Sequence, residues 1–154
     1  MQIRRNEAAI AAARAEAMAR HRAAAIAEVN QMIGAMRAQY ITPIPGQEML
    51  YLAKRAEAAA FLTLDPAPET LDAFPLLAAE IGITAPSAAE LAQIWLNLGA
   101  LWEGVAAQLE ALRLSAIKAI EEAGDGAAIE AAVGQVRAVV GGRGGNGRAE
   151  GNYA

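Results

Sequence analysis

Apolar residues recur along most of the chain at intervals of three and four, which is the spacing of one face of an α-helix. The longest unbroken run begins at Leu91 and continues to Ala116. Ser87 precedes it, with Glu90 three residues later, and this pair matches a capping box that satisfies the free amides of a helix start. The pattern therefore predicts a long helix that begins at Ser87 and ends at Glu122.

Residues 2–40 predict a second long helix, because they contain no proline and only one glycine, Gly34. Its second half carries one apolar stripe, formed by Ile26, Val29, Ile33, Met36 and Tyr40. In its first half the stripe Ile3, Ile10 and Ala17 is out of phase with the later one. This slip resembles a stutter, so the pattern does not require one uniform supercoil.

Prolines and glycines predict where the other helices begin and end. Two prolines and a glycine within residues 40–46 end the first helix. A helix is expected over 47–62, with Met49, Leu52, Ala56, Ala59 and Ala60 inward. A further break at 65–68 precedes a short helix expected over 70–82, with Leu71, Phe74, Leu77 and Ile81 inward. Asp125 can cap a last helix that continues through Val140. The glycine-rich residues 141–154 are expected to form a flexible tail.

The fold class predicted from these elements is all-α, an elongated helical hairpin or bundle with two long helices. The expected divisions are an alanine-rich N-terminal helix (1–40), a helical module (41–140) and a glycine-rich tail (141–154). The two long helices would measure roughly 58 and 52 Å, whereas a compact chain of this length is about 40 Å across. We therefore expect either a rod-like hairpin or packing against copies or a larger partner, and we favour oligomerisation.

Composition and charge refine this picture. Of 154 residues, 55% are apolar but only 5% are aromatic, so an alanine-rich core should be thin. The net charge of −4 is uneven, since residues 1–37 sum to +3 and residues 38–123 to −7. This asymmetry favours antiparallel packing of the first helix on the acidic middle, or head-to-tail contact between copies. Solvated faces that merely differ in charge explain it equally well.

Residues that catalysis or metal binding would need are scarce. The chain has no cysteine and a single histidine, His21, which lies between two arginines. No carboxylate is expected beside His21 to orient its ring. Glu121, Glu122 and Asp125 form the densest acidic group, but at a helix end water satisfies them. Ser87 is better explained as a cap. We therefore expect no catalytic residue, no cofactor and no metal site, and do not expect an enzyme.

Other binding classes are also weakly supported. Trp95 and Trp102 share a helix face and could form an aromatic platform, although a place in the core explains them better. The arginine–glycine tail is too short to favour nucleic acid as a partner. The longest uncharged apolar run, residues 91–102, is too short to span a membrane, and charges in the first 16 residues argue against a signal peptide.

A resemblance to a known family comes from the stretch between residues 40 and 123. It carries Tyr-Ile-Thr-Pro-Ile-Pro-Gly-Gln at 40–47, then Tyr51, Lys54, Glu57 and Ala58, then Phe-Pro-Leu-Leu-Ala-Ala-Glu-Ile-Gly-Ile-Thr at 74–84, and the long helix with Arg113 and Ile117. This stretch resembles a small helical module of tail-associated proteins, of the tail fibre or tail tip, in tailed bacteriophages and prophages. No receptor-binding or β-rich region accompanies it, which favours a connector, fibre-attachment or assembly role.

The resemblance implies a structural virion protein of the phage tail, made in the host cytoplasm, whose partners are other virion proteins and copies of itself. A non-virion helical protein, such as a tail-fibre assembly chaperone or a regulatory coiled coil, is the alternative, and a nucleic-acid-contacting helical protein is a third. The expected interface residues are Ile26, Val29, Ile33, Met36, Tyr40, Tyr51, Leu91, Trp95, Leu98, Trp102, Val105, Leu109 and Leu112.

Overall fold

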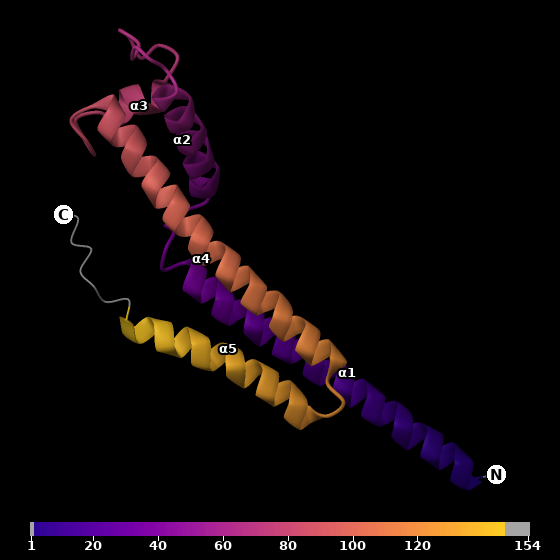
Figure 1. The fold of residues 1–154 in the computed structure, drawn as a ribbon. Coiled ribbons are helices and arrows are strands. Elements are labelled where there is room, and N and C mark those ends of the chain that lie inside the picture. The colour runs from indigo at the N-terminus through magenta and orange to yellow at the C-terminus, as the bar shows by residue number, and fades with distance from the viewer. Residues whose placement is uncertain (1, 147–154) are drawn as a thin grey trace. The chain divides into compact units, whose positions relative to one another are not determined.

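The computed structural model describes residues 2–146, with side chains from 6 to 142, and confirms the all-α class. No strand occurs among these residues, and the helices are α1 (Gln2–Arg37), α2 (Gln47–Leu62), α3 (Pro75–Glu80), α4 (Ala88–Glu122) and α5 (Gly126–Asn146). Figure 1 shows their order along the chain. They form two compact units. Unit 1 comprises the chain up to Arg37 and from Gln108 onward, and unit 2 comprises Ala38–Ala107.

Unit 1 brings together α1, the second half of α4, and α5. Its buried residues are Ala25, Val29, Ile33 and Met36 of α1, Leu109, Ala116 and Ile120 of α4, Ala123 after α4, and Ile129, Ala132, Val133 and Val136 of α5. These spacings of three and four place one apolar face of each helix inward. The core is built mainly from small and medium side chains, as the composition predicts.

Polar contacts define how these helices run. Arg37 of α1 contacts Glu110 of α4, and Arg22 donates to the carbonyl oxygen of Ala123 at 2.7 Å, so α1 and α4 are antiparallel. His21 pairs with Glu130 of α5. Glu28 and Arg137 pair seven residues further along both helices, so α1 and α5 are parallel. Antiparallel packing of the basic first helix on this part of α4 is therefore observed.

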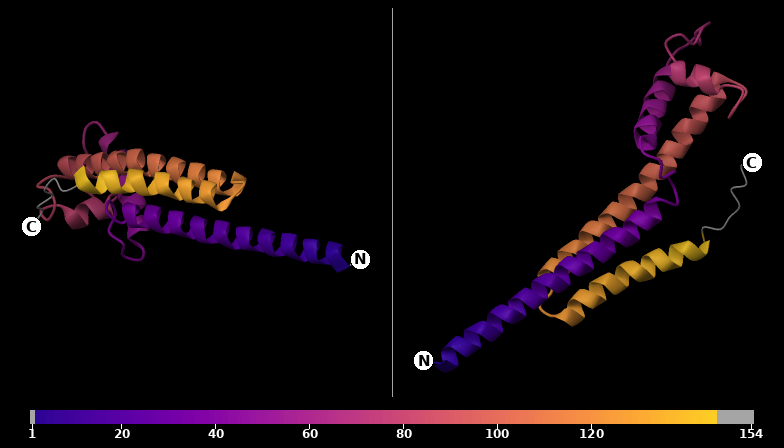
Figure 2. Two further views of the ribbon diagram at one scale, coloured as in Figure 1. Left: turned by 90° about the horizontal axis from the view of Figure 1, so that it is seen from below. Right: turned by 180° about the vertical axis from the view of Figure 1, so that it is seen from behind.

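The N-terminal part of α1 contributes nothing to this core. Every side chain from Asn6 to Ala17 is exposed, whereas burial begins with Met18, which is partly covered. The ribbon views in Figures 1 and 2 show this segment extending beyond the turn that joins α4 and α5. Two members of the out-of-phase stripe, Ile10 and Ala17, are thus exposed, and Ile10 is 45% exposed.

Unit 2 is built on a separate core. Its buried members come from α2, the loops before and after α3, α3 itself and the first half of α4, and they are Ala58, Phe61, Phe74, Leu77, Ala85, Leu91, Ala92 and Trp95. The rings of Phe61 and Phe74 meet edge to face with centroids 5.3 Å apart. Because α2 and α3 each bury only one side, the opposite sides of these helices remain in solvent.

Two capping predictions are confirmed. The Ser87 hydroxyl accepts a hydrogen bond from the Glu90 amide at 3.3 Å, at the start of α4. Asp125 accepts one from the Ala128 amide at 2.8 Å, at the start of α5. Both contacts satisfy amides that have no partner within their own helix.

Three helix boundaries differ from the expectation. The first helix ends at Arg37, and Tyr40 lies in the following turn, where its ring packs 6.5 Å from that of Trp102. The short helix begins at Pro75 instead of residue 70, because proline disfavours helical backbone at the residue before it, and Phe74 has φ −131° and ψ 64°. The last helix continues to Asn146, since extending a formed helix through glycine costs only about 1 kcal/mol per residue. The rest of the expected tail, 147–154, lies outside the described residues.

Candidate interaction surfaces

Two charged residues of α2, Lys54 and Glu57, contact the short helix α3 and fix its position. Lys54 forms an ion pair with Glu80, the last residue of α3, and only 16% and 22% of the two side chains is exposed. The Lys54 ammonium also lies 4.9 Å from the ring centroid of Trp95 on α4. A cation enclosed by a carboxylate and an aromatic face is more strongly stabilised than an exposed surface pair.

Glu57 acts at the other end of α3. Its Oε1 accepts a hydrogen bond from the Leu77 amide at 2.6 Å, whereas Phe74 at the N-cap position supplies no side-chain cap. The carboxylate therefore replaces the missing cap and faces the positive end of the helix dipole. Lys54 and Glu57 thus contact opposite ends of α3 with charges that complement each end, and we call this pair the α3 clasp.

Titration of the neighbouring groups follows from these contacts. Partial burial by itself would raise the pKa of Glu80, but hydrogen bonds from Lys54 and Thr84 outweigh it and leave the pKa below its usual value. The hydrogen bond between the Tyr51 hydroxyl and Thr42 lowers the pKa of that tyrosine. All of these contacts lie within unit 2, so the α3 clasp stabilises the fold of that unit.

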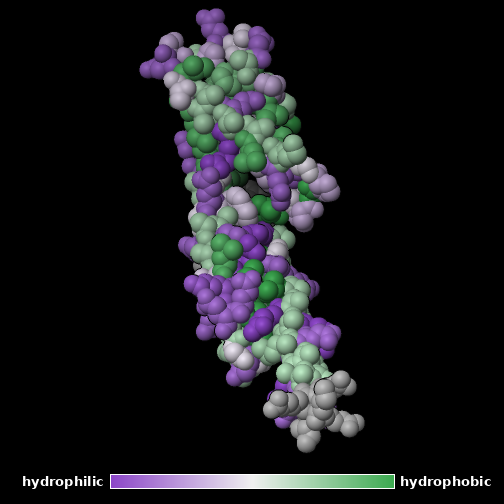
Figure 3. Space-filling view, turned by 90° about the vertical axis from the view of Figure 1, so that its right-hand side faces the viewer, coloured by the Kyte–Doolittle hydropathy of each residue, from purple (hydrophilic) through white to green (hydrophobic). Residues whose placement is uncertain are grey.

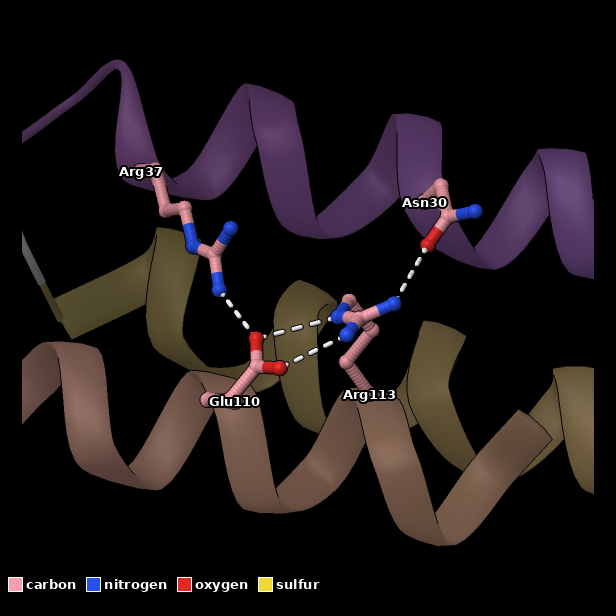
Figure 4. A network of polar contacts seen from close by, with 4 residues as sticks. All are labelled: Asn30, Arg37, Glu110 and Arg113. Atoms are coloured by element: carbon pink, nitrogen blue, oxygen red, sulfur yellow. Dashed lines mark hydrogen bonds and ion pairs between the residues drawn. The ribbon is translucent and has the colours of Figure 1, made fainter. Parts of the chain in front are cut away.

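A polar network in unit 1 joins α1 to α4 (Figure 4). Glu110 accepts from the Arg113 guanidinium at 2.6 and 3.0 Å and from Arg37 at 2.5 Å. Hydrogen bonds from Arg113 and then Arg37 lower the pKa of Glu110 to about 2. Arg113 also reaches Asn30 at 3.3 Å. The network therefore links the two helices through a carboxylate that stays ionised.

An exposed apolar stripe follows α4 through unit 2. Ile94, Leu98 and Leu101 are 36%, 60% and 61% exposed, and Glu90 precedes them on the same helix face. Their spacings of four and three place them in one row.

The inward position of α4 at the level of this row is occupied by Gly99, where an added Cβ would lie 2.4 Å from Cδ of Arg55. A glycine here lets the Arg55 side chain cross α4 and pair with Glu103 at 2.6 Å.

A second exposed apolar surface lies on α2. Met49 is 76% and Leu52 66% exposed, and they are three residues apart on one side of that helix. Ile44 and Ile83, in the loops before α2 and after α3, are 57% and 81% exposed. Large apolar side chains left in solvent in such numbers are typical of surfaces that contact another molecule.

The expected interface residues divide into three groups by burial. Six are buried inside the chain itself, namely Val29, Ile33, Met36, Leu91, Trp95 and Leu109. Five are partly buried: Ile26, Tyr51, Trp102, Val105 and Leu112. Only Tyr40 and Leu98 are exposed, at 43% and 60%. The stripes found in the sequence therefore mark mainly the internal core, with Trp95 buried as expected.

Two surface residues of α4 were missed in the sequence. Ile94 and Leu101 flank Leu98 at helical spacing, so a search for a second stripe on that helix would find them. On α2 the expectation that Met49 and Leu52 face inward is wrong, since they are 76% and 66% exposed, and the three alanines expected beside them, Ala56, Ala59 and Ala60, are exposed as well. The expectation that His21 has no carboxylate beside it is wrong. Its Nε2 lies 2.8 Å from Oε1 of Glu130, which is 109 residues away in the chain.

Among the described residues, no three histidine, cysteine, aspartate or glutamate side chains cluster as a metal site would require. In the same part of the chain, no helix combines the length and hydropathy of a membrane span. Comparison with protein-family models, curated proteins and solved structures gives no match. The likeness to phage tail modules, based on the residues alone, stays a prediction.

Proposed function

We propose that this protein is a structural subunit that works by helix packing in a multimer and does not catalyse a reaction. The observation that supports this most directly is the set of exposed apolar side chains on α2 and α4, where Met49, Leu52, Leu98 and Leu101 are each at least 60% exposed. Covering such side chains releases about 25 cal/mol per Å² of apolar surface removed from water. A multimer would cover them, whereas the single chain leaves them in solvent.

Within this class, the more specific proposal is a tail-associated component of a bacteriophage virion, with a connector, fibre-attachment or tail-tip role. Two observations support this proposal. Residues 40–123 resemble the helical module of phage tail proteins, and two of the residues that carry this resemblance make structural contacts in unit 2. Lys54 and Glu57, which are spaced as in the phage modules, form the α3 clasp that shapes unit 2. The alternative is a tail-fibre assembly chaperone that binds through the same surfaces and leaves before the particle is complete.

Quantitative mass spectrometry of purified virions separates these two functions. A tail component is expected in mature particles at a fixed copy number, and absence from them would leave the chaperone. A complementation assay with a double variant, Leu98→Gln with Leu101→Gln, then tests whether the α4 stripe is used. We expect this variant to reduce the yield of infectious particles, while Ser115→Gln, at an exposed position of α4 outside the stripe, serves as the matched control.

A further inference from the structure

We propose that two copies of this chain pair through the N-terminal part of α1. Residues 6–17 of one copy, which we call the docking segment, lie antiparallel to the docking segment of the second copy, and a two-fold axis relates the two. This inference rests on the multimeric character of the proposed function and specifies one contact of the multimer. It does not depend on whether the multimer belongs to a virion.

The docking segment continues a face of α1 that already packs against a helix. His21 and Glu28 lie seven residues apart on α1, and both form ion pairs with α5. Arg14 and Glu7 precede His21 at the same spacing, so the four side chains form one row along the helix. At Gly126, where α5 begins, an added Cβ would lie 3.3 Å from the His21 ring. Because α5 runs parallel to α1 from this point, it covers only the later half of the row and leaves Arg14 and Glu7 exposed.

Beside these two charges the docking segment carries an uncovered apolar seam. Ile10, which is 45% exposed, is followed on the same side of the helix by Ala13 and Ala17, both exposed, and we call these three residues the α1 seam. At the lower end of Figure 3 the surface of α1 is mostly pale green, the shade of alanine. An isolated helix of this length is only marginally stable in water, so a second helix that covers the seam would stabilise it.

The order of the charges selects the occupant and its direction. Glu7 and Arg14 lie on the same side of the α1 seam, and among the described side chains neither has an ion-pair partner. In an antiparallel pair of identical helices these sides face each other, so Glu7 of each copy meets Arg14 of the other. A parallel pair does not bring these sides together. Glu16 and Arg20, on the other side of the seam, already pair with each other.

The apolar residues fit in the same register. When Glu7 faces Arg14 of the other copy, the seams interdigitate with Ile10 of each copy against Ala13 of the other, a large side chain against a small one. This register pairs residues 6–17 of one copy with residues 17–6 of the other, over about 18 Å. The paired region ends before Met18, where α1 begins to be covered by its own unit. A second copy therefore covers the docking segment without displacing the contacts of unit 1.

Charge reversal tests this pairing, in the Leu98→Gln, Leu101→Gln background so that the α4 stripe does not contribute. Glu7→Arg alone and Arg14→Glu alone each turn both ion pairs of the dimer into like-charge contacts. Sedimentation equilibrium should show dimerisation weakened by roughly tenfold in each. Glu7→Arg combined with Arg14→Glu restores opposite charges and should dimerise like the parent chain. An equimolar mixture of the two single variants should form a heterodimer.

Controls assign every outcome. Ala12→Gln, an exposed substitution on the side of α1 opposite Ile10, should dimerise like the parent, whereas Ile10→Gln should weaken the dimer. Circular dichroism verifies that each variant folds, since all these positions are exposed. Single charge variants that dimerise like the parent, or a double variant that stays weakened, would overturn the antiparallel contact. A parent chain that is monomeric at high concentration would overturn it too. The virion measurement above is independent, so a protein present in particles without this dimer would reject only this inference.

Discussion

Replacing Glu57 tests whether α3 depends on a cap supplied by another helix. Glu57→Ala removes the acceptor of the Leu77 amide, which lies 2.6 Å from Oε1. Loss of an N-cap acceptor costs about 1 kcal/mol, and loss of a negative charge at a helix N-terminus costs a further 0.3–1 kcal/mol. We therefore expect the free energy of unfolding to fall by about 1–2 kcal/mol. Glu57→Gln keeps an acceptor and loses only the charge, so it should cost about 0.3–1 kcal/mol.

The assay is urea unfolding followed by tryptophan fluorescence, since Trp95 belongs to the core of unit 2. Amide hydrogen exchange at Leu77 provides a local measurement, and it should accelerate in Glu57→Ala. The control is Glu69→Ala, an exposed carboxylate in the loop before α3, which should change stability by less than about 0.5 kcal/mol. If Glu57→Ala matches this control in stability and leaves exchange at Leu77 unchanged, the capping role of Glu57 is refuted.

Three further predictions concern other parts of the fold. The pKa of Glu110 is lowered from 4.5 to about 2, so its contribution to stability is complete above pH 4.5 and is lost as the pH falls toward 2. Acid titration of the unfolding free energy should show this loss, and the loss should be absent in Glu110→Gln. Gly34→Ala, at an open position inside α1, should stabilise the protein by roughly 1 kcal/mol in thermal unfolding. Gly82→Ala, at φ 81°, should destabilise it by about 1–2 kcal/mol, and a change in the same direction for both variants would contradict this reasoning. Ile120→Val, fully buried, should cost about 0.5–1.5 kcal/mol in urea, and Leu101→Ala, exposed, less than about 0.5; the reverse order would contradict the assignment of core and surface.

Local signals in the sequence were sufficient to predict that each of the five helices exists and to identify Ser87 and Asp125 as capping residues. The bounds Gln47–Leu62 follow from the prolines and glycine before the helix, and the start of α4 follows from Ser87 and Glu90. These features depend on residues a few positions apart, whose geometry the backbone determines. The start of α3 was misjudged because Leu71 and Phe74 fit a helical pattern, although Pro75 prevents helical backbone immediately before it.

Placing residues in the core or at the surface was less successful, for two reasons. A strict alternation of four and three drifts by about 20° per heptad on a straight helix, so a stripe through Leu98 departs from the true inward row. The inward position there is Gly99, which hydrophobicity alone would not select. The second reason is distance along the chain. His21 with Glu130 and Lys54 with Glu80 meet only once the fold has formed, and no local pattern indicates such contacts.

The parallel pairing of α1 with α5 has a consequence for the length of α1. Among the side chains that the structure describes, from Asn6 onward, the first to contact α4 or α5 through polar groups are His21 and Arg22. No described contact of unit 1 therefore fixes how many of the residues from 6 to 17 precede them. Deleting residues 7–13 would shorten the projecting helix by about 10 Å and preserve the helical phase to within about 20°. The core of unit 1 would be unchanged. The segment can therefore act as a spacer, whose length can change independently of the stability of the fold.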